Sequence, residues 1–216
     1  MSDLTYTLLT DGSSDDALKP VVEWLLQVNG VSCAIQGAWA DLRRLPRPPR
    51  GLTARVEKAV ELYPCELLFI HRDAEGEPYE SRENEIRRAV AEANFEEGLA
   101  PIWVCAIPVR MAEAWLLFDE VALRKATGNP SGRVLLELPP LSRCESIPDP
   151  KSVLENLLVK ASELGSRRRV QLSTGGMMRR ITEYASDFRP LRELPAFAAL
   201  ERDIKTAIRT NGWDRR

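Results

Sequence analysis

Three carboxylates follow two apolar segments of this chain at a spacing that suits metal chemistry. Asp11 comes directly after the β-branched run 4–10, and Asp73 and Glu75 follow the apolar run 66–71. If these runs form neighbouring parallel strands, the acids meet at one edge of the sheet, where their like charges repel. A divalent cation relieves this repulsion, because Mg²⁺ prefers carboxylate, water and phosphate oxygens as ligands. Such an ion polarises a phosphoryl oxygen or lowers the pKa of a bound water.

The polar residues around these acids also have structural interpretations. Asp11 stands beside Gly12 and fits a turn. Asp15 and Asp16 fall in the first turn of an expected helix, where the helix dipole favours negative charge. His71 is the only histidine of the chain, and it fits either a general acid or base or a structural hydrogen bond at the end of a strand. From the residues alone, both interpretations stay open for each of these positions.

Strand-like and helical segments alternate in the part of the chain that carries these acids. The expected strands are 4–10, 31–37, 66–71 and 102–109. The expected helices are 17–28, 52–63, 80–97 and 111–126. The run 66–71 has an apolar core on both faces, as in a parallel strand that helices cover on both sides. The alternation predicts an α/β fold with a doubly wound, mainly parallel sheet of the Rossmann-like kind.

The pattern changes after residue 126. Residues 127–150 read as a proline-rich loop, and further helices are expected at 151–164, 177–186 and 196–209. We expect an α/β domain over 1–126 and a basic C-terminal helical extension over 151–216 that packs on the same domain. Residues 1–150 carry 16 basic and 24 acidic side chains, a net of −8, whereas residues 151–216 carry 14 and 8, a net of +6. This split indicates either an anion-facing surface in the extension or two complementary faces.

Basic residues outside the acidic segments are candidates for phosphate contacts. The segment 43–50, Arg-Arg-Leu-Pro-Arg-Pro-Pro-Arg, contains too much proline for a helix or a central strand, so we expect an exposed basic loop. Lys151 and the arginines 167–169 are further candidates, although most such side chains are simply solvated. Gly175 and Gly176 could bind a phosphate, but a turn before a helix explains them equally well.

Composition excludes several classes of protein. The chain has 216 residues, 44% hydrophobic, and no apolar run approaches the roughly 18 residues that a membrane span requires. The N-terminus lacks the pattern of a signal peptide, and the four cysteines are scattered, so a cytoplasmic protein with free thiols is expected. Neither a GxxxxGK[ST] loop nor a GxGxxG turn is present, which disfavours nucleotide-binding enzymes. A receiver domain is disfavoured because it needs a second acid after the first strand and a lysine after the last.

Four segments together resemble a known family. The segment Leu8–Asp15, Leu-Leu-Thr-Asp-Gly-Ser-Ser-Asp, resembles the first TOPRIM motif, and Phe69–Gly76, Phe-Ile-His-Arg-Asp-Ala-Glu-Gly, resembles the second. Glu113–Asp119 and Asp149–Lys151 are similar to segments that recur in small stand-alone TOPRIM-like proteins, which are related to the nuclease half of OLD-family proteins. The resemblance covers about residues 4–155.

The resemblance implies a TOPRIM-like fold and Mg²⁺- or Mn²⁺-dependent phosphodiester hydrolysis of nucleic acid, with DNA as the expected substrate. It implies Asp11, Asp73 and Glu75 as metal ligands and catalytic residues, and Glu113 as a fourth acid of the site. Glu113 also fits a polar position beside the core residue Trp115. Relatives often occur beside ABC-type or AAA ATPases in bacterial anti-phage systems, so an ATPase partner and a role in antiviral defence are further expectations.

Two departures from the family pattern keep a rival hypothesis open. Asp11 stands where the family usually has Glu, and Glu75 stands where it usually has a second Asp. Both exchanges keep the charge but shift the carboxylate by one methylene group. The rival is a TOPRIM-like subunit that binds an ATPase or nucleic acid without cleaving it. The basic extension fits either hypothesis, because phosphate neutralisation gives binding that is independent of sequence. Self-association is also left open.

Overall fold

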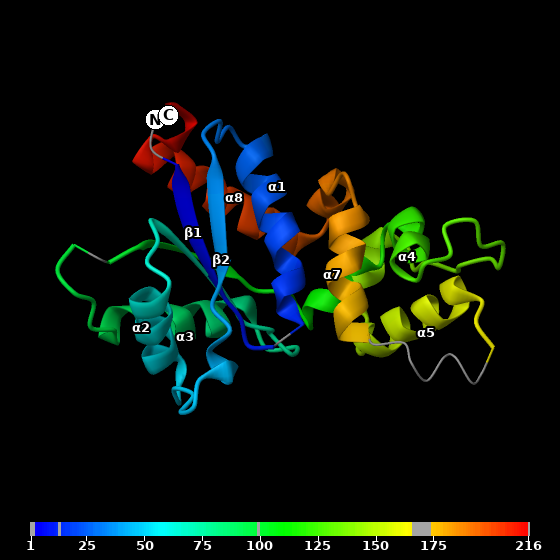
Figure 1. The fold of residues 1–216 in the computed structure, drawn as a ribbon, viewed down its shortest axis with the longest axis horizontal. Helices are drawn as coiled ribbons and strands as arrows, with labels where there is room; N and C mark the ends of the chain where they lie inside the picture. The colour runs from blue at the N-terminus through cyan, green and yellow to red at the C-terminus, as the bar shows by residue number, and fades with distance from the viewer. Residues whose placement is uncertain (1–2, 13, 99, 166–173, 216) are drawn as a thin grey trace.

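A computed structural model of the chain describes residues 3–12, 14–98, 100–165 and 174–215. Four parallel strands form one sheet in the order β2-β1-β3-β4. The strands are β1 (Leu4–Leu9), β2 (Ile35–Trp39), β3 (Leu67–His71) and β4 (Ile102–Ala106). Figure 1 shows this sheet with helices on both sides and a group of helices beside it. The predicted α/β class, with a doubly wound parallel sheet and C-terminal helices, is confirmed.

The two strands that carry the acids are neighbours, as the sequence hypothesis required. β1 pairs with β3 in parallel, with Tyr6 opposite Leu67 and Leu9 opposite Ile70. All five residues of β3 are buried, because this central strand is covered on both faces. The strand expected from residue 31 begins only at residue 35. The main chain of Val31 donates to the carbonyl of Leu26 and so still closes the preceding helix.

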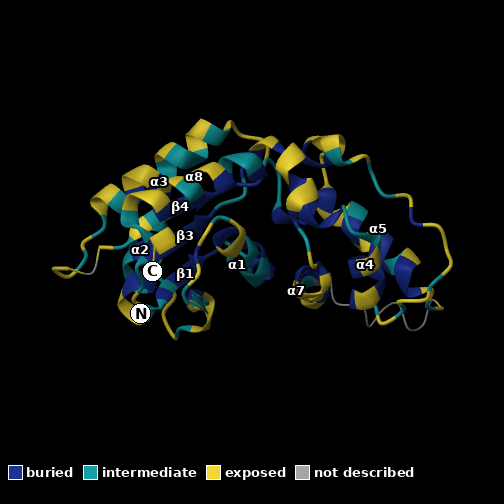
Figure 2. Ribbon diagram, turned by 90° about the horizontal axis from the view of Figure 1, so that it is seen from above, coloured by how far each residue is buried: buried dark blue, intermediate teal, exposed yellow. Residues whose placement is uncertain are grey.

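Helices cover the two faces of the sheet in pairs. The first face carries α1 (Lys19–Val28) and α8 (Pro195–Asn211), and the second carries α2 (Leu52–Leu62) and α3 (Tyr79–Glu92). Figure 2 shows the buried strands between helices whose exposed residues face outward. The chain leaves β1 over the first face and returns from β2 to β3 over the second. The winding therefore reverses between β1 and β3, where open α/β sheets bind their ligands.

The remaining helices form a second cluster beside the sheet. They are α4 (Glu120–Ala126), α5 (Pro150–Ser162) and α7 (Thr174–Tyr184). Short 3₁₀ turns connect the elements: η1 (Asp15–Leu18), η2 (Leu42–Arg44), η3 (Ala112–Leu116), η4 (Leu141–Ser146), η5 (Arg189–Glu193) and η6 (Trp213–Arg215). The helix expected over 111–126 is divided into η3 and α4, because Asp119 accepts from the main chain of Ala122 at 2.9 Å and starts a new helix. The helix expected to run to 97 ends at Glu92, since Ala93 is extended.

One hydrophobic core joins the sheet to the C-terminal helices. Trp115 of η3 packs edge-on against Phe197 of α8, with 5.4 Å between the ring centroids. The Trp115 indole donates to the buried carboxylate of Glu145 at 3.2 Å, and Glu145 also accepts from the main chain of Ala196 at 3.3 Å. Helix α8 thus holds both the face of the sheet and η3 in place. The divisions expected at residues 126 and 150 stay predictions.

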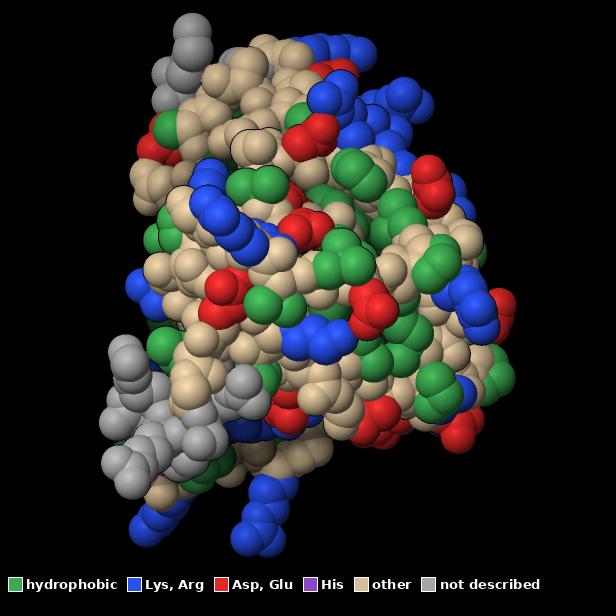
Figure 3. Space-filling view, turned by 90° about the vertical axis from the view of Figure 1, so that its right-hand side faces the viewer, with side chains coloured by type: hydrophobic (Ala, Val, Ile, Leu, Met, Phe, Trp, Pro, Cys, Tyr) green, Lys and Arg blue, Asp and Glu red, His purple; other side chains and the backbone are tan. Residues whose placement is uncertain are grey.

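Charges of both signs cover the end of the molecule that carries α4 and α5. Figure 3 shows Lys and Arg side chains interspersed with Asp and Glu on that face. Arg192 of the extension pairs with Glu201 of the same segment at 2.6 Å, and Lys160 of the extension pairs with Glu137 of the preceding segment at 2.9 Å. Part of the positive charge of 151–216 is therefore used in ion pairs. The arginines 167–169, named as candidates for phosphate contacts, lie outside the described residues. No helix among the described residues is long and apolar enough to cross a membrane.

Truncating Phe197 tests whether α8 belongs to the core that supports the sheet. Phe197→Ala removes a fully buried ring, so we expect the free energy of unfolding to fall by about 3 to 5 kcal/mol. Urea denaturation followed by circular dichroism measures this loss. Tyr184→Ala is the matched control, because Tyr184 is 43% exposed, and it should change stability by less than about 1 kcal/mol. Equal effects of the two substitutions would contradict the packing.

Candidate active site at the reversal of the sheet

Acidic residues from three loops gather beyond the carboxyl ends of β1, β3 and β4. Asp15 lies in η1 after β1, Asp73 follows β3, and Glu113 lies in η3 after β4. The Asp73 carboxylate accepts from the main chain of Ala112 at 3.2 Å, which ties the loop after β3 to the loop after β4. Sheet topology thus places these acids at the reversal point, where substrates of open α/β proteins bind.

His71, at the end of β3, lies between two of these acids. Its Nδ1 is 3.4 Å from Asp15 Oδ2, and its Nε2 is 3.2 Å from Asp73 Oδ1. Neither nitrogen meets hydrogen-bond geometry, so we treat the contacts as ionic. Burial alone would lower the pKa of His71, but Asp73, Asp15 and Asp11 together raise it above its usual value. The acids around His71 therefore favour its protonated form, which would be an internal cation of this acidic group.

Asp15 lies in the first turn of η1, as its helix-dipole interpretation expects, but its side chain points inward. Its Oδ2 accepts from the main chain of Gly12 at 2.6 Å, and it is 5% exposed. A Cβ at position 12 would lie 2.6 Å from the same oxygen, so Gly12 allows the carboxylate to approach. The sequence left the role of Asp15 open, since a charge in a first helical turn is ordinary. The signal that pointed to it was the small-residue turn before the second acid of the first motif.

Glu113 belongs to the same electrostatic group. It is 5% exposed, and burial raises its pKa, with further increases from the charges of Asp73 and Asp15 and a decrease from Lys151. Lys151 comes from the Asp-Pro-Lys segment, in which Asp149 caps α5 by accepting from the main chain of Ser152 at 3.0 Å. A carboxyl with a raised pKa keeps its proton to higher pH and can act as a general acid.

Asp11 lies beside this group but faces arginines. Arg55 Nη1 is 2.7 Å from its Oδ1, and Arg72 Nε is 2.7 Å from its Oδ2. Arg72 also pairs with Glu85 of α3 at 2.8 Å. Both oxygens of Asp11 are therefore neutralised by guanidinium groups. Sequence reasoning missed both arginines: Arg72 stood within the second motif, whereas nothing in the sequence linked Arg55 of α2 to this position.

Glu75 is turned away from the other predicted ligands. Its backbone has φ +55°, which is uncommon for a residue other than glycine. Its side chain is 72% exposed and lies 3.2 Å from Arg82 Nη2. Of the three predicted ligands, Asp73 lies in the acidic group with Glu113 and Asp15. Asp11 lies beside this group with its arginines, and Glu75 is directed toward solvent.

The chemical type of these donors suits a divalent cation, whereas their arrangement among the described residues does not form a site for one. Carboxylate oxygens from Asp15, Asp73 and Glu113 are the donor type that Mg²⁺ and Mn²⁺ prefer. The negative charge that raises the pKa of Glu113 is the charge a cation would offset. Within the part of the chain that the structure describes, however, no three His, Cys, Asp or Glu residues stand close enough to hold an ion.

Comparisons of this chain with family models, with curated proteins and with solved structures found no match in any of the three. The relation to TOPRIM-like proteins therefore rests on the four sequence segments and stays a prediction. The fold and the geometry at the reversal of the sheet are the observations from which a function can be argued.

The environment of His71 predicts a pH dependence of stability. Because the neighbouring acids raise the pKa of His71 in the folded protein above its ordinary value of 6.5, protonation stabilises the fold. This contribution is fully present below pH 6.5 and is lost as the pH rises through the folded pKa. We expect the single histidine Hε1 resonance to titrate with a midpoint above 6.5, measured by proton NMR.

The same loss should be visible in unfolding experiments. The free energy of unfolding should decrease over this pH window in the unmodified protein, and His71→Asn should lack that part of the decrease. A midpoint at or below 6.5 would mean that Asp15 and Asp73 do not hold the imidazolium.

Proposed function

We propose that this protein hydrolyses phosphodiester bonds of nucleic acid with Mg²⁺ or Mn²⁺ at the acidic group between β1 and β3. One observation carries the proposal: two adjacent parallel strands deliver carboxylates to the point where the winding of the sheet reverses. This is where an open α/β sheet binds a ligand, and carboxylates are the ligands of the metal that phosphodiester hydrolysis commonly uses.

The residues have distinct roles in this proposal. Asp73, with Asp11 and Glu75 as the resemblance implies, would hold the ion, and the inward position of Asp15 adds a further donor. When bound, the ion supplies positive charge to a phosphoryl oxygen and acidifies a water. Glu113 would hold a proton for the leaving oxygen, because burial and its acidic neighbours raise its pKa. His71 positions Asp15 and Asp73 through its two ionic contacts.

The anti-phage setting of the proposal comes from the resemblance, and the cytoplasmic location comes from the scattered cysteines of the sequence. We place this activity in the cytoplasm, as the effector of a bacterial anti-phage system that works with an ABC-type or AAA ATPase. DNA is the proposed substrate.

A second candidate function is favoured by the ion pairs of Asp11. A residue held by both Arg55 and Arg72 at 2.7 Å is less available to a metal than an unpaired acid. With Glu75 also directed outward, the protein would bind nucleic acid or an ATPase without cleaving. Stable co-purification with an ATPase encoded nearby, while Asp73→Ala keeps biological activity, would favour this candidate.

Asp73→Asn tests the hydrolytic proposal. We expect the purified protein, alone or with its ATPase, to cleave plasmid or single-stranded DNA in Mg²⁺ or Mn²⁺. The substitution should reduce the rate at least 100-fold, because it removes a charge from the proposed metal site. Gel electrophoresis of the products measures the rate.

Glu77→Gln is the matched control, since Glu77 lies in the same loop and is exposed. It should keep full activity. Activity that survives Asp73→Asn, or that is absent with both metals and with the ATPase present, would refute hydrolysis at this site.

A further inference from the structure

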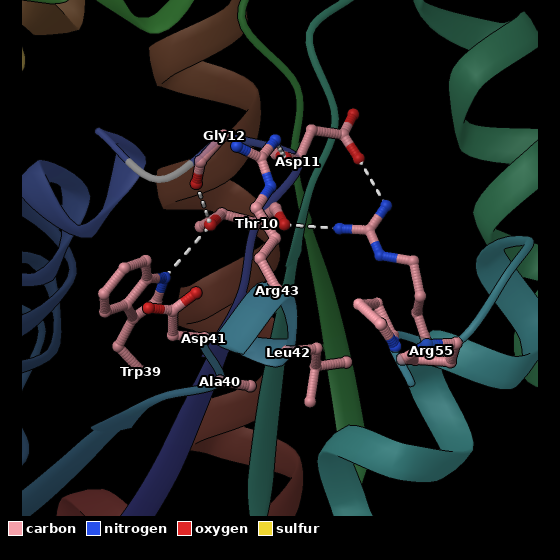
Figure 4. A pocket seen from close by; sticks show the side chains of 11 residues that line it. Thr10, Asp11, Gly12, Trp39, Ala40, Asp41, Leu42, Arg43 and Arg55 are labelled. Carbon is pink, nitrogen blue, oxygen red and sulfur yellow. Dashed lines mark hydrogen bonds and ion pairs between the residues drawn. The ribbon is translucent and has the colours of Figure 1, made fainter. Parts of the chain in front are cut away.

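The basic loop, residues 43–50 after β2, presents a set of exposed arginines next to the acidic site. Arg43, Arg44, Arg47 and Arg50 are all exposed. The loop begins within η2, which contains Arg43 and Arg44. Figure 4 shows the Arg43 guanidinium directed at the loop that follows β1. Arg43 Nη2 donates to the main-chain carbonyl of Asp11. The basic loop expected from the sequence therefore contacts the proposed active site.

Three of these arginines form no ion pair with an acid among the described residues. Arg44 pairs with Asp41 at 2.6 Å. Arg43 bonds only to a carbonyl, and neither Arg47 nor Arg50 forms an ion pair with any described residue. Three arginines in one short loop that form no ion pair with a described residue leave positive charge for a ligand.

A cavity of about 240 Å³ separates this loop from the end of β1. Its lining comes from the loop after β1, the end of β2, the basic loop and α2. Arg43 and Arg55 contribute guanidinium groups, and the lining acids Asp11 and Asp41 are paired with Arg55 and Arg44. Arg55 donates to the main-chain carbonyl of Thr10 and to the carboxylate of Asp11. The Trp39 indole donates to the Thr10 hydroxyl at 3.0 Å, which fixes the wall of the cavity. The size of the cavity and the presence of two guanidinium groups suit a phosphate.

The loop is held rather than free. Leu42 at its start is 5% exposed and belongs to the core beneath α2 and α3, and Leu52 packs on the same core at its end. Pro46, Pro48 and Pro49 restrict the backbone between them. A restricted loop loses little conformational entropy when its arginines bind a ligand.

We propose that this loop binds the phosphate backbone of nucleic acid, with one phosphate in the cavity between Arg43 and Arg55, and guides the strand to the acids at the sheet reversal. The inference rests on the proposed function and names its substrate-binding element. A polyanion is repelled by Asp15, Asp73 and Glu113. Cations on the approach to those acids offset the repulsion and raise the local concentration of the substrate.

Binding without cleavage tests the loop. The triple variant Arg43→Gln/Arg47→Gln/Arg50→Gln is compared with the unmodified protein by fluorescence anisotropy, using a labelled single-stranded DNA in EDTA over a range of salt concentrations. Each lost phosphate contact lowers the slope of log K against log salt by about 0.7 for single strands. We therefore expect the slope to fall by about 2 in the triple variant, and by about 0.7 in Arg50→Gln alone.

A control variant removes the same charge elsewhere. Arg189, Arg202 and Arg209 are exposed and lie in η5 and α8, whereas the loop leads into α2 on the opposite face of the sheet. Their triple replacement by Gln should leave the slope unchanged. An equal reduction by both triple variants would show a general charge effect, and no reduction by the loop variant would show that the loop does not bind the backbone. Either result overturns the inference.

The outcome is separable from that of the hydrolysis experiment. Loop-dependent binding in EDTA without cleavage in Mg²⁺ or Mn²⁺ would keep the inference and refute hydrolysis. If cleavage depends on Asp73 but the loop variant has an unchanged salt slope, hydrolysis at this site is supported and the inference about the loop is refuted. If the loop variant binds DNA normally but no longer binds the ATPase, the loop is a protein-docking element and the inference is wrong.

Discussion

Repulsion among carboxylates at the ends of β1 and β3 is the constraint on which the rest of the site depends. Each acid there is accommodated by a different means. Asp15 and Asp73 share the His71 imidazolium, whereas Asp11 takes two arginines. Glu113 is accommodated through a raised pKa. Because the compensating groups come from β3, α2 and the loop after β3, the acids can gather only when the sheet is assembled.

The C-terminal helices contribute to this site without entering it. Helix α8 covers the face of the sheet beside α1, and Phe197 packs against Trp115 in the 3₁₀ turn that carries Glu113. Lys151, at the start of α5, lies within electrostatic reach of the same glutamate. The extension is therefore part of the support of the acidic group, in addition to any role of its positive charge.

The two candidate functions differ in what happens to the cations around the acids. In a hydrolase, a metal ion would take over charge that His71 and the arginines now neutralise. In a binding protein, the arginines themselves would be the working groups, and the acids would orient them. The arginines of the basic loop would serve a hydrolase and would equally serve a protein that binds nucleic acid without cleaving it, because the phosphate backbone reaches this point in both.

Local pattern in the sequence determined the strands, most helices and the arrival of Asp11 and Asp73 at one edge, since apolar runs and turn residues act over short distances. It also indicated the exposed basic loop. Only the tertiary structure decided the partners of these residues. Asp15 turned inward through contacts with Gly12 and His71, and Arg55 reached Asp11 from 44 residues away along the chain. Glu75 has a left-handed backbone conformation and lies outward beside Arg82. Charge pairing acts through space between separate elements, so residue spacing along the chain does not encode it.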